Sequence, residues 1–137
     1  MPTPIGHALG GVAAGALVVR QLPLDIQFLG QRLSAPLLFA FLGMFADIDF
    51  VVMVGHRHAT HSISAAILAG AATVFIAPRQ LRVWVASAAA YGTHVLLDWL
   101  GTDTVAPFGL MALWPFDTAH YQSSLGWFYP VCREYWL

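Results

Sequence analysis

The chain has 137 residues, of which 58% are hydrophobic and only 9% are charged, and it contains no lysine. Soluble globular domains are about 45–50% apolar, so this composition argues against an ordinary soluble domain and predicts one membrane-embedded domain over residues 1–137. The formal net charge of −1 offers no basic surface, so no nucleic-acid partner is expected. The single Cys132 cannot form an internal disulfide and does not indicate a compartment.

Four apolar stretches predict transmembrane helices, because a spanning helix needs about 20 mostly apolar residues. The predicted spans cover residues 5–22, 34–54, 62–77 and 82–100. Small residues recur in three of them and favour close helix packing in lipid. Residues 101–137 are rich in aromatic residues, which predicts an interfacial cap. The expected fold class is therefore an all-α integral membrane protein, a four-helix transmembrane bundle with an aromatic-rich interfacial C-terminal segment.

Arginines predict the orientation of these spans. Arg20 and Arg32 flank the connection between the first two spans, and Arg79 and Arg82 flank the connection between the last two. The positive-inside rule places both connections in the cytoplasm. The prediction is a multi-pass protein with both termini on the extracytoplasmic side.

Polar clusters interrupt the apolar stretches at the ends that this topology places on the extracytoplasmic face. They comprise His7, then Asp47 and Asp49, then residues 56–62, then His94 and Asp98. An ionised Asp at a span centre costs roughly 2.5–3.5 kcal/mol, and a divalent cation would compensate several acids at once. Histidine and carboxylate are usual ligands of such ions. The alternative is that the acids lie in the wet interface without a metal.

The spacing within two clusters limits which side chains share a site. His94 and Asp98 are four residues apart and lie on one helical face, where they would bind one ion or form a simple hydrogen bond. Asp47 and Asp49 are two apart and cannot share a face of a regular helix. Either the helix frays there or one acid is a ligand, while the other bridges a second metal or orients a histidine.

Residues 56–62 contain three histidines and one arginine, which packing alone hardly explains. His56 and His61 are candidate metal ligands, whereas His58 is a ligand or a surface residue. Arg57 has a planar guanidinium that suits a phosphate oxygen, with a position among lipid headgroups as the alternative.

Two further pairs of residues have weaker assignments. Thr60 or Ser62 is expected to cap the third helix. Asp117 and His120 are three residues apart in the C-terminal segment, and they are either late ligands or ordinary polar residues.

These residues together resemble the YdjM-like family of inner-membrane metal-dependent hydrolases, also described as LexA-binding. The motifs that carry the resemblance are Thr3-Pro4-x-x-His7, Ala46-Asp47-Ile48-Asp49, His56-Arg57-x-x-Thr60-His61-Ser62, His94-x-x-Leu97-Asp98, Phe108-Gly109 and Leu113-Trp114-Pro115-Phe116. The family is in turn similar to the zinc-dependent phospholipase C and P1 nuclease group. The resemblance implies a bacterial inner-membrane location.

The resemblance also implies metal ligands, namely His7, Asp47 or Asp49, His61, His94 and Asp98. The soluble enzymes carry a later His-x-x-x-Glu element, whereas the only Glu here is Glu134, which has no His four residues before it. One or two ions, zinc or else manganese, are therefore expected in place of a complete three-zinc cluster.

The functional prediction is a membrane-embedded metal-dependent hydrolase of a phosphoester in a lipid or lipid-linked substrate. Arg57 would hold the phosphate, and Asp47 or Asp49 would accept a proton. The lipid bilayer is the expected partner, and a homo-oligomer is left open. Two alternatives remain at this point: a metal or proton site in a small transporter or channel, and a membrane interaction or regulatory protein.

Overall fold

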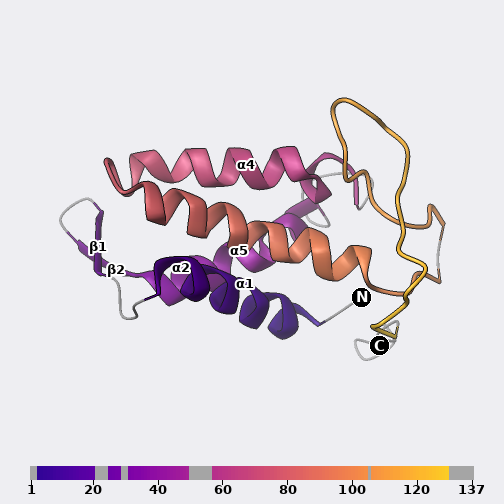
Figure 1. Ribbon diagram of the computed structural model, residues 1–137, viewed down its shortest axis with the longest axis horizontal. Helices are drawn as coiled ribbons and strands as arrows, with labels where there is room; N and C mark the ends of the chain where they lie inside the picture. The colour runs from indigo at the N-terminus through magenta and orange to yellow at the C-terminus, as the bar shows by residue number, and fades with distance from the viewer. Residues whose placement is uncertain (1–2, 21–24, 29–30, 50–56, 105, 130–137) are drawn as a thin grey trace.

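A computed structural model gives the fold of the chain and describes residues 3–20, 25–28, 31–49, 57–104 and 106–129 (Figure 1). The α-helices lie side by side along the longest axis of the molecule, and the segment after α5 is irregular. In chain order the elements are α1 (Pro4–Val19), β1 (Asp25–Phe28), β2 (Gln31–Ser34), α2 (Ala35–Phe45), η1 (Ala46–Ile48), η2 (Ala59–His61), α4 (Ile63–Ala72), η3 (Thr73–Phe75) and α5 (Leu81–Trp99).

Side-chain caps determine where two of the helices begin. Thr3 precedes α1 and its hydroxyl oxygen accepts a hydrogen bond from the Gly6 N–H at 3.2 Å. Ser62 precedes α4 and accepts from the Ala65 N–H at 3.0 Å. Each cap satisfies an N–H group that has no partner within its helix. Of the two capping candidates before α4, Ser62 is therefore the cap.

Helix α5 is the centre of the bundle, since it packs against α1, α2 and α4. Helices α1 and α2 approach each other at Gly11 and Gly43, where their Cα atoms face each other closely. A methyl group on Gly43 would overlap the backbone oxygen of His7. This contact holds the first turn of α1 against the last turns of α2, which is the end of the bundle where the polar residues gather.

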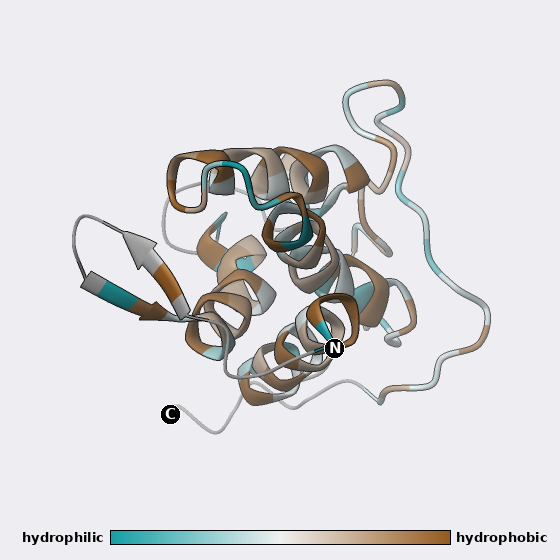
Figure 2. Ribbon diagram, turned by 60° about the vertical axis from the view of Figure 1, so that its left-hand side comes forward, coloured by the Kyte–Doolittle hydropathy of each residue, from teal (hydrophilic) through white to brown (hydrophobic). Residues whose placement is uncertain are grey.

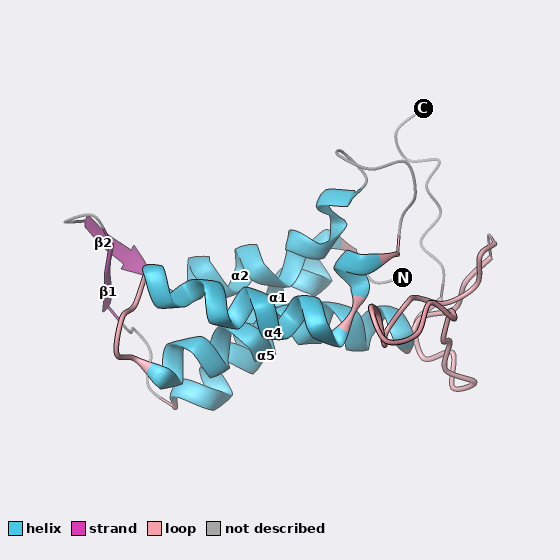
Figure 3. Cartoon of the chain, turned by 90° about the horizontal axis from the view of Figure 1, so that it is seen from above, coloured by secondary structure: helices cyan, strands magenta, loops and turns pink. Residues whose placement is uncertain are grey.

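A two-stranded antiparallel hairpin joins α1 to α2, with Asp25 paired to Ser34 and Phe28 to Gln31. It lies at the opposite end of the bundle from the C-terminal segment, as the view from above shows (Figure 3). The prediction of an all-α fold missed it. Its sequence signal is the alternation of polar and apolar residues in Asp-Ile-Gln-Phe, and Ile26 is fully buried.

The prediction of a four-helix transmembrane bundle is wrong, because no described helix is both long enough and apolar enough to cross a membrane. Helix α1 has 16 residues, which is about 24 Å of helix against roughly 30 Å of hydrocarbon. Helices α2 and α4 are shorter, with 11 and 10 residues, because each passes into a 3₁₀ turn. Helix α5 has 19 residues but includes Arg82, His94 and Asp98. The multi-pass topology and the orientation of the termini, which rest on four spans, are therefore unsupported.

Large apolar side chains lie on the surface of the bundle as well as in its core. Hydrophobic residues occur along every helix (Figure 2), and Leu17 and Phe75 are 78% and 82% exposed. The aromatic side chains of Phe116 and Tyr129 in the C-terminal segment are also exposed. Where such side chains form a large contiguous patch, the patch usually marks an interaction surface.

Candidate metal centre

Five of the residues selected from the sequence meet at one end of the bundle. His7 lies in the first turn of α1, Asp47 in η1, His61 in η2, and His94 and Asp98 in the last turns of α5. Because α1 begins at the end of the bundle where α5 finishes (Figure 1), segments far apart in the sequence contribute to one cluster. The predicted convergence of the polar clusters therefore occurs, although no membrane face is established for it.

Four of these side chains could hold one ion: Asp47, His61, His94 and Asp98, called here the four-ligand group. The two histidine Nε2 atoms are 3.2 Å apart. Oδ1 of Asp47 lies 3.6 Å from Nε2 of His61 and 3.5 Å from Nε2 of His94. Oδ2 of Asp98 lies 3.5 Å and 3.4 Å from the same two atoms.

These separations match a tetrahedral zinc site. Ligand atoms about 2.0–2.1 Å from a tetrahedral zinc ion are about 3.3–3.4 Å from one another. The five distances above, 3.2 to 3.6 Å, lie close to this value. Two imidazole and two carboxylate donors are also a ligand set that zinc accepts, so the residues fit the metal that the sequence predicts.

A hydrogen bond to the backbone orients His94 as a metal ligand. Its Nδ1 lies 2.7 Å from the backbone oxygen of Gly43, and a carbonyl oxygen only accepts, so Nδ1 carries the proton and donates. In the neutral ring the lone pair of Nε2 then faces the four-ligand group. Outer-shell hydrogen bonds of this kind fix the tautomer of metal-binding histidines.

Asp47 and Asp49 contact opposite sides of the His61 ring. Nδ1 of His61 lies 3.2 Å from Oδ2 of Asp49, whereas Nε2 faces Asp47. Asp49 also accepts hydrogen bonds from the Arg57 N–H at 3.0 Å and the Thr60 hydroxyl at 2.8 Å. The 3₁₀ turn η1 replaces the regular helix that would have separated the two acids. Of the alternatives that the spacing left open, this arrangement favours Asp47 as ligand and Asp49 as the group that orients His61.

His7 borders the four-ligand group and does not belong to it. Its ring stacks on His94 with centroids 3.8 Å apart and planes 18° apart. Its Nε2 lies 3.3 Å from Oδ1 of Asp98, and both side chains are almost fully buried. The carboxylate of Asp98 thus has one oxygen toward His7 and the other toward His61 and His94.

The charges of the cluster are strongly coupled. Burial would raise the pKa of Asp98, but hydrogen bonds with His7 and His94 outweigh this and hold the pKa well below its usual value. For Asp47 burial is likewise outweighed, by hydrogen bonds with His61 and His94, and its pKa is lowered. Conversely, burial would lower the pKa of His94, yet Asp47 and Asp98 raise it to about 10. The buried carboxylates therefore favour a positive charge beside them, which protons or a metal ion would provide.

Arg57 forms a buried ion pair with Asp103 of the C-terminal segment, their side chains being 10% and 6% exposed. Its backbone has a positive φ of 71°, a conformation that costs a non-glycine residue energy unless its surroundings enforce it. Here the N–H donates to Asp49 and the carbonyl oxygen accepts from Met111 at 3.2 Å. Arg57 thus connects the C-terminal segment to residues 57–62, called here the histidine-rich loop. Its role as a phosphate-holding group stays a prediction.

The remaining predicted site residues lie elsewhere or are not described. His56 lies outside the described residues. The ring of His58 packs edge-on against that of His120 with centroids 5.9 Å apart, and neither joins the four-ligand group. Asp117 accepts hydrogen bonds from the Tyr121 hydroxyl and the Ala119 N–H, as an ordinary polar residue of a turn would.

Two contributors to the site were not identified from the sequence. Tyr91 donates a hydrogen bond from its hydroxyl to the Thr60 carbonyl at 2.8 Å and so supports the loop that carries His61. Its position three residues before His94 places it on the same helical face, which was an available signal. Gly43 contributes only a backbone oxygen, for which side-chain identity gives no signal.

The fold and the cluster define a class of protein, an all-helical bundle apart from one hairpin, with a buried His/Asp group suited to a divalent metal. The family model described as YdjM inner membrane protein matches residues 1–133. The chain belongs to this family, which confirms the resemblance seen in its motifs. No curated protein and no solved structure matches the chain.

Proposed function

We propose that this chain is a metal-dependent hydrolase and that the four-ligand group holds its divalent ion, with zinc favoured over manganese. The observation that carries the proposal is the placement of four donor atoms from three separate elements, with the five distances that involve His61 and His94 close to those of a tetrahedral zinc site. A bound zinc ion would act as a Lewis acid and lower the pKa of a coordinated water. The four-ligand group fits one ion. A second ion would have His7, which lies beside Asp98, as a ligand.

The four ligands differ in exposure, and this difference suggests their roles. The side chains of His61, His94 and Asp98 are buried, whereas the Asp47 side chain is 26% exposed. Catalytic zinc sites keep three protein ligands and one open position. We therefore propose that His61, His94 and Asp98 would be the permanent ligands, and that Asp47, on the exposed side, would give up its position to water and accept a proton from it. Asp49 is buried beneath His61 and orients that ring.

The proposed substrate is a phosphoester in a lipid or lipid-linked molecule, and the proposed partner is the lipid bilayer. The family is one of inner-membrane proteins, and the exposed apolar side chains described above suit contact with lipid. Arg57 is the cation nearest in sequence to the site that suits a phosphate, but a phosphate would have to compete with Asp103 for it.

Metal analysis combined with a chromogenic phosphodiester tests the proposal. The purified chain is stripped of metal, loaded with zinc or manganese, and assayed with bis(4-nitrophenyl) phosphate. We expect one to two ions per chain and metal-dependent turnover. Both should be lost in a His61→Ala, Asp98→Ala double variant and kept in Asp117→Asn, an exposed carboxylate outside the group. Helical circular dichroism checks that each variant folds. Metal binding that raises the melting temperature without any turnover would indicate a structural site and overturn the enzyme proposal.

A further inference from the structure

His58 and His120 form a second histidine pair, outside the four-ligand group. Their rings meet edge-on, with centroids 5.9 Å apart and planes 76° apart. His58 belongs to the histidine-rich loop, whereas His120 lies in the C-terminal segment, and both residues are partly buried. The proposed hydrolysis uses neither of them, so the pair calls for an explanation of its own.

Backbone hydrogen bonds bring the two histidines together. The carbonyl of Arg57, the residue before the first histidine, accepts from the Met111 N–H at 3.2 Å. Tyr121, the residue after the second histidine, exchanges two backbone hydrogen bonds of 2.8 and 3.0 Å with Leu110. Because Leu110 and Met111 are adjacent in the chain, these bonds link the two histidine positions through a short run of backbone.

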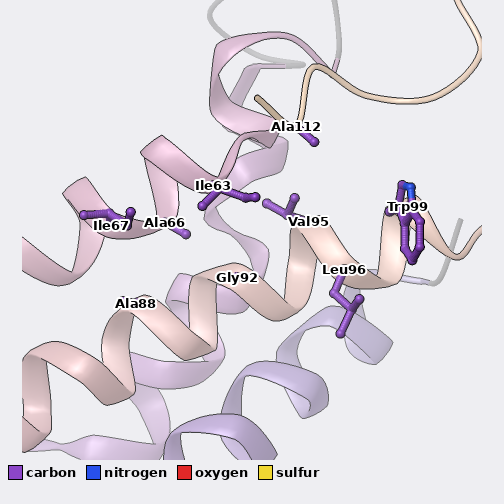
Figure 4. Close-up of a pocket in the computed structure, with 9 residues that line it drawn as sticks. All are labelled: Ile63, Ala66, Ile67, Ala88, Gly92, Val95, Leu96, Trp99 and Ala112. Carbon is purple, nitrogen blue, oxygen red and sulfur yellow. The ribbon is translucent and has the colours of Figure 1, made fainter. Parts of the chain in front are cut away.

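A third contact holds the C-terminal segment against the start of α4. The Ile63 N–H donates to the Ala112 carbonyl at 3.0 Å, and Figure 4 shows Ala112 beside the first turn of that helix. The fold therefore sets the positions of both rings before any ligand binds, and a site arranged in advance loses less entropy on binding.

One nitrogen of the pair is buried without a hydrogen bond. Nε2 of His120 is shielded from solvent, and no described residue provides it with a hydrogen-bond partner. Such an atom is destabilising and is uncommon in folded proteins. Edge-on packing is a favourable arrangement of two aromatic rings, but it does not satisfy this nitrogen. The nitrogen is therefore suited to binding a ligand.

The separation of the two rings suits imidazoles that share one metal ion. The centroid of an imidazole lies about 3.2 Å from a metal bound to one of its nitrogens. Two such rings are about 4.5 Å apart when they bind at a right angle and about 6.4 Å apart when they bind on opposite sides. The observed 5.9 Å lies within this range. The last side-chain torsion of histidine is soft, so small rotations would aim both rings at one ion.

Two neutral imidazoles favour a particular kind of ion. In the part of the chain that the structure describes, no third His, Cys, Asp or Glu completes a metal-binding group with them. Zinc takes three or four protein ligands, and calcium and magnesium take oxygen ligands, so these ions suit the pair poorly. Copper(II) binds nitrogen ligands more tightly than zinc and accepts a tetragonal arrangement, which water molecules would complete.

We propose that His58 and His120 bind one copper(II) ion, which cross-links the histidine-rich loop to the C-terminal segment. This cross-link adds to the ion pair of Arg57 with Asp103, which joins the same two segments. The copper site does not depend on the four-ligand group or on the proposed hydrolysis, and failure of either proposal leaves the other standing.

Counting copper in matched variants tests the site. The full-length chain is loaded with one zinc ion, dialysed against copper(II) and analysed for both metals. We expect the wild type to bind one copper ion more than His58→Phe, His120→Phe, which keeps two aromatic rings but has no ring nitrogen. Copper that displaces zinc at the four-ligand group does so in both proteins, so the difference reports only the pair. Equal copper contents would overturn the site and show adventitious binding.

Single variants and a neighbouring carboxylate provide the controls. His58→Phe and His120→Phe should each weaken copper binding about tenfold or more, since one imidazole ligand is lost. Helical circular dichroism checks folding, and either single variant replaces a double variant that fails to fold. Asp117→Asn removes the carboxylate three residues before His120 and should keep the affinity within about twofold. A tenfold loss in Asp117→Asn would overturn a site made of two imidazoles.

Two further measurements test the ligands and the cross-link. The electron paramagnetic resonance spectrum of the additional copper should show coupling to two nitrogen nuclei, and coupling to one or none would contradict the pair as ligands. Hydrogen exchange followed by mass spectrometry should slow about tenfold over residues 110–121 when copper binds. Exchange at an unchanged rate in copper-loaded protein would overturn the cross-link.

Discussion

Nδ1 of His61 lies 3.2 Å from Oδ2 of Asp49, on the side of the ring opposite the four-ligand group. A carboxylate in this position holds a metal-binding imidazole in one orientation and raises its basicity. Asp49 is itself fixed by the backbone N–H of Arg57 and the hydroxyl of Thr60. Asp49, held by these two hydrogen bonds, thus orients His61 as a ligand without being a member of the four-ligand group.

The first prediction concerns this positioning role. Asp49→Asn keeps the size of the side chain but removes its charge, so we expect zinc affinity to fall about 10- to 100-fold, with one ion still bound at saturation. Competition with a chelating dye measures the affinity. Asp117→Asn is the control, because it removes a charge outside the group. Complete loss of the ion in a folded Asp49→Asn variant would show that Asp49 is a direct ligand.

The second prediction concerns the stability of the metal-free chain as the pH changes. The raised pKa values of His61 and His94 stabilise the fold fully below the unfolded value of 6.5, and this contribution is lost as the pH rises, through about 10 for His94. The lowered pKa values of Asp47 and Asp98 stabilise it above 3.8 and are lost as the pH falls below that value. The melting temperature of the metal-free chain should therefore be highest between pH 3.8 and 6.5.

Zinc should counteract the fall in melting temperature that the metal-free chain shows above pH 6.5. The metal binds unprotonated imidazole, so its binding releases protons and strengthens as the pH rises from about 6 to about 9. The gap between the melting temperatures with zinc and with a chelator should widen over this range. A gap of constant size would contradict the assignment of His61 and His94 as ligands. His58→Ala, outside the four-ligand group, should leave the gap unchanged.

The third prediction contrasts two glycines. Gly43→Ala would press a methyl group on the His7 backbone and displace the carbonyl that accepts from His94. Overpacking of this kind costs about 1–3 kcal/mol of unfolding free energy, and zinc affinity should fall with it. Gly92→Ala meets no close neighbour and should stabilise the chain by up to about 1 kcal/mol. Chemical denaturation measures both. Equal destabilisation by the two substitutions would contradict the packing described for α1 and α2.

The composition of the cluster was predictable from the sequence because ligand spacing is local. His94 and Asp98 share a helical face whatever surrounds the helix, and apolar stretches that alternate in direction bring their ends together. The helix lengths were not predictable in this way. The turn that ends α2 before Asp47 replaces the long regular helix expected there, and it lets Asp47 and Asp49 reach opposite nitrogens of His61. The different roles of Asp47 and Asp49 depend on their tertiary contacts with His61 in η2, and the apolar periodicity of the sequence does not encode these contacts.

Contacts between segments that are distant in the sequence could likewise not be predicted from it. The ion pair of Arg57 with Asp103 joins the histidine-rich loop to the irregular C-terminal segment, and nothing in either local sequence specifies the other partner. Two backbone hydrogen bonds join the same two segments. The Met111 N–H donates to the Arg57 carbonyl, and the Ile63 N–H donates to the Ala112 carbonyl. The described part of the C-terminal segment lies at the site end of the bundle (Figure 1), and its expected role as an interfacial cap stays a prediction.

The last prediction separates two roles of Arg57. Asp103→Asn leaves the buried guanidinium without its counter-charge, which should cost about 3–5 kcal/mol of unfolding free energy, whereas Arg57→Met, Asp103→Asn removes both charges and should recover much of it. Denaturant unfolding measures stability, and turnover of bis(4-nitrophenyl) phosphate is followed in parallel. If Arg57 only ties the C-terminal segment to the loop, turnover recovers with stability in the double variant. If Arg57 also holds the phosphate, turnover stays low while stability returns, because the double variant has no cation in that position.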